Sequence, residues 1–338
     1  MTGQNQYFPQ SRPHPGETLA EKLEEMEMGP KEFSLRTGKP EKTIIAVLKG
    51  DSSITPDMAV QFEYVTQIPA GFWMNHQRAY DEFIAREKHK AVVQAAADWA
   101  KRFPMAEMIQ KGWLPPAGTR QEKTQELLAF FGFAHPTAWE AYYFKQQLKV
   151  AFRISLAQTK APYAISAWLR KGELQAAQLE AGGYSAKRFR DALPQIKSLM
   201  AGHPDGFFHR LQRICLDAGV KVVHTPCLDN TPIHGSTRWI KDTPLIQLTG
   251  RYPRHDGFWF TFFHEAGHIL LHGKKDVFLE KLDYSDMDKK KEQEADVFAK
   301  AWTLTGAEEA ALLAVGHRGD PCVQKPQLSL NQHPRRTP

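Results

Sequence analysis

The stretch 257-GFWFTFFHEAGHILLHG-273 contains the pattern His-Glu-x-x-His at residues 264–268. Its apolar flanks predict a buried helix, and Gly273 predicts where that helix ends. On a helix, His264 and His268 lie one turn apart on the same face. Two imidazoles at that spacing can bind one Zn²⁺ at about 2.0–2.1 Å, and Glu265 beside them can deprotonate a water. The stretch therefore predicts a buried helix that carries the active site of a metal-dependent hydrolase, most often a peptidase.

A second helical pattern follows in the acidic stretch 289-KKKEQEADVFA-299. Catalytic zinc usually takes three protein ligands and leaves one position for water. Glu292 is the predicted third ligand, and Glu294, on a different face of the helix, is the alternative. Asp296, one turn after Glu292, is predicted to hold the second ring nitrogen of a ligand histidine. The ligand set favours Zn²⁺ and leaves Mn²⁺ or Fe²⁺ open. A chance pattern on a solvated surface helix is the alternative, which the apolar flanks argue against.

Together the two stretches FWFTFFHEAGHILLHG and EQEADVFAKAW resemble the ImmA/IrrE family of bacterial metallopeptidases over about residues 210–305. The resemblance implies a zincin-like domain whose metal ligands are His264, His268 and Glu292. It implies that Glu265 is the general base. It also implies a narrow protein substrate, such as a repressor or an antitoxin.

His272 continues the one-turn series of histidines. The third histidine of a metzincin would come six residues after His268, so we interpret His272 as a helix-end residue whose ring binds backbone carbonyls. A peptidase also needs a hydrogen-bond donor for the oxyanion. The candidates in the preceding loop are Arg251, Tyr252, Arg254 and His255.

Residues 15–85 contain closely spaced helix-breaking residues, which predict a series of short helices. Two short helices joined by a Gly-containing turn are typical of a helix-turn-helix unit. The stretches 37-TGKPEKTIIAVLKG-50 and ITPDMAVQFEYVTQIPAGFWMNHQRAYDE resemble the XRE-type domain of HigA-like antitoxins. The resemblance implies an operator-binding domain, and a domain that reads a palindrome would favour a homodimer.

By position, this resemblance makes residues 40–49 the recognition helix. Lys39, Lys42 and Thr43 would then face the major groove, and Lys49 would contact a phosphate. The alternative is a helical unit that serves protein contacts or dimerisation, with solvated lysines.

Residues 86–205 are predicted to form a helical connecting region, because helix-spaced apolar residues recur there. The predicted helices are 91–102, 121–131, 139–152 and 161–181, and Pro194 is interpreted as a break. Short β-rich runs at 220–225, 235–241 and 245–249 predict a small sheet just before the 257–273 helix. Residues 244–249 are interpreted as an edge strand that could hold a substrate backbone.

The bulk properties of the 338 residues are those of an ordinary globular protein with a net charge of +6, which permits contact with nucleic acid. No apolar run is long enough for a membrane span, and residues 1–16 lack the apolar core of a signal peptide. The three cysteines form no Cys-x-x-Cys pair, so reduced thiols and a cytoplasmic location are expected.

The sequence thus predicts a mainly α fold with a small β-sheet (α+β). Its parts are a helix-turn-helix domain at 15–85, a helical connecting region at 86–205, a zinc metallopeptidase domain at 206–317 and a disordered tail at 318–338. We expect a DNA-binding transcriptional regulator with a zinc-dependent endopeptidase that acts on a repressor or antitoxin. One alternative is an antitoxin or autorepressor whose metal domain senses a signal or binds a partner such as a cognate toxin. Another is a metal-stabilised interaction protein without either activity.

Overall fold

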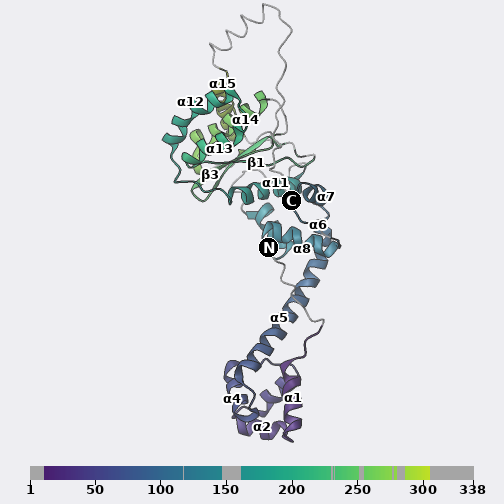
Figure 1. Cartoon of the computed structure of the whole chain (residues 1–338). Coiled ribbons are helices and arrows are strands. Elements are labelled where there is room, and N and C mark those ends of the chain that lie inside the picture. Colours follow the sequence, from purple (N-terminus) through teal and green to yellow (C-terminus); the bar gives the residue numbers. More distant parts are fainter. Residues whose placement is uncertain are drawn as a thin grey trace, which may run out of the picture. The chain divides into compact units, whose positions relative to one another are not determined.

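The computed structural model describes residues 11–116, 118–146, 161–229, 231, 233–250, 255–275, 278–279 and 286–304. The chain forms two compact units, and the division falls after Ala95. Figure 1 labels helices and strands of both units. Both units are built mainly from helices, and the second also contains a small mixed sheet, which confirms the predicted fold class. The tail predicted to be disordered, 318–338, lies outside the described residues.

The first unit is a bundle of short helices followed by a long one. Phe33, Phe62 and Trp73 are fully buried and pack together, with ring centroids 5.0 and 6.1 Å apart. Gly38 joins the second and third helices with a φ of 67°, a left-handed conformation that glycine adopts without strain. The helices are α1 (Pro15–Glu25), α2 (Pro30–Thr37), α3 (Glu41–Leu48), α4 (Pro56–Thr66) and α5 (Ala70–Ala95).

The helices of the second unit include three that the sequence patterns did not single out, α7 (Met105–Gln110), α12 (Ala186–Gly202) and α13 (Phe207–Asp217). Pro194 lies inside α12, so its interpretation as a break is wrong. Helix α12 continues through Pro194 because Phe189, Leu193 and Ile196 are all fully buried on one face. The helices are α6 (Ala97–Ala100), α7 (Met105–Gln110), α8 (Arg120–Phe131), α9 (Pro136–Glu140), the π-helical η1 (Ala141–Gln146), α11 (Pro162–Ala176), α12 (Ala186–Gly202), α13 (Phe207–Asp217), α14 (His255–His272), the 3-10 turn η3 (Gly273–Lys275) and α15 (Asp286–Thr303).

The predicted sheet is present, with strands in the order β1-β3-β2-β4. Strands β1 and β3 are parallel, and β2 is antiparallel to both β3 and β4. The interpretation of residues 244–249 as an edge strand is wrong, because β3 pairs with β1 on one side and β2 on the other. Strand identity follows from local residue pattern, whereas the neighbours of a strand depend on distant residues. The strands are β1 (Lys221–His224), β2 (Gly235–Ile240), β3 (Thr243–Leu248) and β4 (Phe278–Leu279).

Helices cover both faces of this sheet. Alternate residues of a strand point to opposite faces, and on β2 the Thr237 hydroxyl oxygen lies 3.0 Å from the Glu265 carbonyl oxygen of α14. The neighbouring Arg238 donates to the Leu169 carbonyl of α11, 2.6 Å away. The sheet therefore separates α11 from α14, and α14 is enclosed on its other sides by residues of α12, α13 and α15. This enclosure explains why α14 is apolar nearly all round.

Candidate metal centre

Helix α14 brings three polar side chains into the interior of the second unit. His264, Glu265 and His268 are only 2%, 0% and 1% exposed. Ionisable groups buried to this extent are costly unless they are paired or bind a metal. Their surroundings are therefore the first test of the predicted site.

Helix α15 packs beside α14 and adds Glu292 to the two histidines. The Nε2 atoms of His264 and His268 are 3.0 Å apart. The Glu292 carboxylate oxygens lie 3.2 Å from Nε2 of His264 and 3.4 Å from Nε2 of His268. Each of His264, His268 and Glu292 offers one possible ligand atom, and these three atoms lie within 4.8 Å of one another. Ligand atoms at about 2.0–2.1 Å around a tetrahedral zinc would be separated by roughly 3.3 Å, so this donor set fits such an ion.

The other ring nitrogen of each histidine also has a side-chain partner. His264 Nδ1 lies 2.9 Å from Oδ1 of Asp296, the contact that the sequence predicted for that residue. His268 Nδ1 lies 3.0 Å from Nδ1 of His272, and His272 Nε2 lies 3.0 Å from a carboxylate oxygen of Glu294. The interpretation that backbone carbonyls satisfy His272 is therefore wrong. The structure separates the two candidate ligands, because Glu292 faces the imidazoles and Glu294 contacts His272.

Glu265 lies against the start of β2. The Thr237 hydroxyl donates a 2.6 Å hydrogen bond to Oε2 of Glu265. A Cβ atom at Gly235 would lie only 2.6 Å from Oε1 of Glu265, so glycine is needed there for the strand to approach the carboxylate. Sequence reasoning did not single out Thr237, although its place in an alternating strand pattern puts it on one face of the sheet.

Burial and hydrogen bonding oppose each other in the electrostatics of the site. Burial lowers the pKa of His264, but its hydrogen bonds with Asp296 and Glu292 outweigh this effect and raise the pKa to about 10. Burial lowers the pKa of His268 to about 4. Burial would raise the pKa of Glu292, but the two histidines lower it to about 2. Because a metal binds neutral imidazole, binding would release a proton from His264.

The predicted oxyanion donors are only partly described. Arg251, Tyr252 and Arg254 lie outside the described residues. His255 begins α14, where its Nε2 is 2.9 Å from the Met200 carbonyl oxygen.

The residues predicted to contact DNA lie on and beside α3. Lys42 and Lys49 are exposed, whereas Thr43 is partly buried. The Lys39 ammonium forms a salt bridge with the Asp57 carboxylate at the start of α4. Of the predicted set, the two exposed lysines are the more accessible to a phosphate or a base.

Comparisons with known proteins found similarities for both parts of the chain. Residues 215–321 match the family described as Peptidase_M78, IrrE N-terminal-like domain. The chain therefore contains a domain of this metallopeptidase type, and its N-terminal region resembles helix-turn-helix regulators and HigA-type antitoxins, as the sequence predicted. A relative, the uncharacterised helix-turn-helix regulator YddM of Escherichia coli, is 29% identical over 70 residues, which are 21% of this chain and 74% of the relative.

Solved structures similar to the chain include two antitoxin-type proteins. One is described as an addiction module antidote protein of the HigA family from Coxiella burnetii, with 33% identity and a TM-score of 0.24, covering 25% of this chain and 95% of that one. Another is the Pseudomonas aeruginosa antitoxin HigA with its promoter, with 28% identity and a TM-score of 0.23, covering 23% of this chain and 86% of that one. Among the described residues, no helix is both long and apolar enough to cross a membrane.

Proposed function

We propose that the protein is a transcriptional regulator that combines operator binding in its first unit with zinc-dependent endopeptidase activity in its second. The observation that carries the peptidase proposal is the buried group of His264, His268 and Glu292 with Glu265 beside it. The M78-type match over residues 215–321 supports the same reaction class. The proposed substrate is a regulatory protein such as a repressor or an antitoxin.

The residues of the site have separate roles in this proposal. His264, His268 and Glu292 would hold Zn²⁺, which when bound would act as a Lewis acid toward the peptide carbonyl and lower the pKa of the attacking water. Glu265 would accept the proton from that water and pass it to the amine nitrogen that leaves. Asp296 would orient the ring of His264 through its Nδ1 atom.

The proposed DNA contact uses the exposed face of α3. Gly38 sets the turn between α2 and α3, and Lys42 and Lys49 are exposed on and after α3. The similarity to the regulator YddM supports this assignment. Because operator DNA is in the cytoplasm, we place the protein there. A homodimer that reads a palindromic operator is part of the same proposal.

The peptidase proposal is tested by changing the base and leaving the metal ligands in place. The zinc-loaded chain and its Glu265→Gln variant are incubated with the DNA-binding proteins encoded beside the gene, and fragments are identified by mass spectrometry. We expect the variant to keep its zinc and to cleave at least about 100-fold more slowly. Equal cleavage by both proteins would contradict the mechanism. Zinc binding without cleavage by either would favour the antitoxin or partner-binding alternative.

The DNA proposal is tested with the gene's own upstream fragment and a scrambled fragment over a range of salt concentrations. We expect the upstream fragment to bind more tightly at moderate salt. Lys42→Ala should weaken binding and reduce the salt dependence by about one counterion. Lys187→Ala is the matched control and should leave binding unchanged, because Lys187 is an exposed lysine of the second unit. Equal binding of both fragments that salt abolishes would indicate charge attraction alone.

A further inference from the structure

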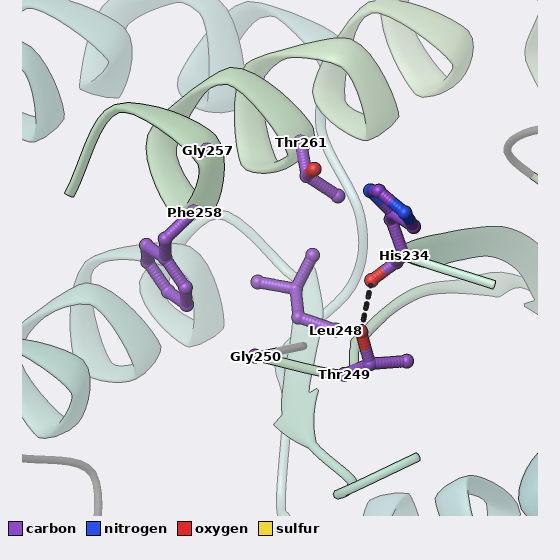
Figure 2. Close-up of a pocket in the computed structure, with 7 residues that line it drawn as sticks. All are labelled: His234, Leu248, Thr249, Gly250, Gly257, Phe258 and Thr261. Carbon is purple, nitrogen blue, oxygen red and sulfur yellow. Dashed lines mark hydrogen bonds between the residues drawn. The ribbon is translucent and has the colours of Figure 1, made fainter. Parts of the chain in front are cut away.

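A cleft lies beside the first two turns of α14, where residues 255–261 contribute to its lining. It consists of a narrow cavity of about 20 Å³ and an adjoining open cavity of about 600 Å³, which share His234, Gly257 and Thr261. Figure 2 shows the first cavity, where Thr261 and Phe258 of α14 face Leu248 and Thr249 at the end of β3. We call the two cavities together the α14 cleft.

The α14 cleft lies next to the residues proposed to carry the reaction, although none of them lines either cavity. Thr261 precedes His264 by three residues and Glu265 by four, so it lies one turn before them on the same side of the helix. A Cβ atom at Gly235 would lie 2.6 Å from Oε1 of Glu265 and 2.7 Å from Cγ2 of Thr261. Glu265, the proposed base, and Thr261, which lines the cleft, therefore both lie next to Gly235 of β2.

A residue of the second cavity also lies close to one of the metal-binding residues. Phe260 lines it, and the Phe260 ring centroid is 6.3 Å from that of His264. A substrate whose peptide bond lies at the metal site would therefore have a neighbouring side chain at the cleft.

The chemistry of the lining is mostly apolar. Leu248 and Phe258 line the first cavity, and Met200, Phe260 and Leu304 line the second. The Thr249 hydroxyl donates to the His234 carbonyl, 3.0 Å away. Among the described residues that line the cleft there is no lysine or arginine; the titratable side chains are those of His234, His255 and the exposed Asp256. An apolar side chain would bury its surface here, whereas a charged side chain would lose water.

Building on the proposed peptidase function, we propose that the α14 cleft is a specificity subsite for an uncharged, apolar side chain next to the scissile peptide bond. The substrate class is then a regulatory protein with an apolar residue beside its cleavage site. An acidic residue at that position disfavours cleavage.

The test measures binding to the zinc-loaded full chain, so it does not require the natural substrate. The probes are the hydroxamates of N-acetylglycine, N-acetylleucine and N-acetylglutamate, which share a zinc-binding group and differ in side chain. Isothermal titration calorimetry should show that the leucine probe binds roughly 10- to 100-fold more tightly than the glycine probe. The glutamate probe should bind no more tightly than the glycine probe.

A pair of glycine variants tests whether the preference for the leucine probe arises in the α14 cleft. Gly257→Leu places a side chain in the cleft at a helical position where leucine has the higher helix propensity. It should reduce the preference for leucine to within about threefold of the glycine probe, because it fills the site. Gly202→Leu is the matched control, since it lies at the end of α12 with no atom within 4 Å of its added Cβ. This control should keep the full preference.

The outcomes separate the subsite from the proposed peptidase centre. If all three probes bind with equal affinity, or if Gly257→Leu keeps the preference for leucine, the subsite proposal is wrong and the metal site stands. If the zinc-loaded chain binds none of the probes, the open coordination position is contradicted. The peptidase proposal and the subsite would then fail together.

Discussion

At the residue scale, the Thr237 hydroxyl is the contact that holds the proposed base. Its 2.6 Å hydrogen bond to Oε2 of Glu265 crosses from the sheet to α14. A hydrogen bond to a charged group contributes about 1.5–3 kcal/mol. Thr237→Val should therefore lower kcat by roughly tenfold or more and leave the zinc content unchanged, as measured by steady-state cleavage and metal analysis.

The conservative variant distinguishes positioning from packing. Thr237→Ser keeps the hydroxyl and should recover most of the rate, although it removes a methyl group. If the valine variant cleaves at the wild-type rate, the hydrogen bond does not position Glu265.

His272 is a second residue whose role depends on its contacts. It lies between Nδ1 of His268 and the Glu294 carboxylate, each 3.0 Å away. Loss of a side chain that supports a metal ligand typically weakens metal binding 10- to 100-fold. His272→Ala should therefore weaken zinc binding by about that factor in competition with a chromophoric chelator.

Two further variants serve as controls for the effect of His272→Ala on zinc affinity. Glu294→Gln should have a smaller effect, because its side chain is 46% exposed and solvent screens its charge. His209→Ala, which removes an exposed imidazole on α13, should leave zinc affinity unchanged. Unchanged affinity in the His272 variant would mean that His272 only ends the helix.

At the element scale, the turn between α13 and β1 is a crowded connection that uses a left-handed glycine. Gly219 has a φ of 82°, and a Cβ there would lie 2.5 Å from the backbone of Tyr184. Gly112 has a similar φ of 67° with no atom within 4 Å of an added Cβ. The two positions therefore share the backbone strain and differ in the steric clash.

This comparison predicts that a glycine-to-alanine substitution lowers the free energy of unfolding by different amounts at the two positions. Gly112→Ala should lower the free energy of unfolding of the second unit by about 1–2 kcal/mol, from the left-handed backbone alone. Gly219→Ala should cost about 1–3 kcal/mol more, because a backbone must move. Urea unfolding of the full chain measures both, and equal losses would show that the turn relaxes without cost.

At the scale of the whole molecule, the proposed metal joins two helices that are distant in sequence. Two ligands lie on α14 and the third on α15, and the residues that the structure describes contain no other such group. A ligand that binds the native state stabilises it by about 2.7 kcal/mol at a concentration of 100 Kd. Zinc should therefore stabilise the second unit selectively.

Hydrogen exchange followed by mass spectrometry checks this expectation on the full chain. Adding a chelator should speed amide exchange in α14 and α15 and leave α1 to α4 unchanged, and zinc should restore the protection. A chelator effect on both units, or on neither, would contradict a metal site confined to α14 and α15.

The predicted domain boundaries at 85/86 and 205/206 stay predictions. The structure divides after Ala95. It also shows that α11, which belongs to the predicted connecting region, packs against the sheet. The Trp168 indole donates to the Thr225 carbonyl, 2.9 Å away, and Gln247 on β3 donates to the Trp168 carbonyl, 2.7 Å away. Such contacts join residues that are far apart in sequence, so helix periodicity alone could not predict them.

The sequence by itself determined the local features of this protein. Helical spacing places His264 and His268 on one face, and glycine and proline positions mark the helices of the first unit, because both depend only on neighbouring residues. Tertiary structure alone decided which contacts the remaining side chains make. It brought Glu292 rather than Glu294 to the two imidazoles, placed Thr237 on Glu265 and His272 on His268, and put β3 inside the sheet. The physical reason is that these contacts depend on how separate helices and strands pack, which local residue patterns do not encode.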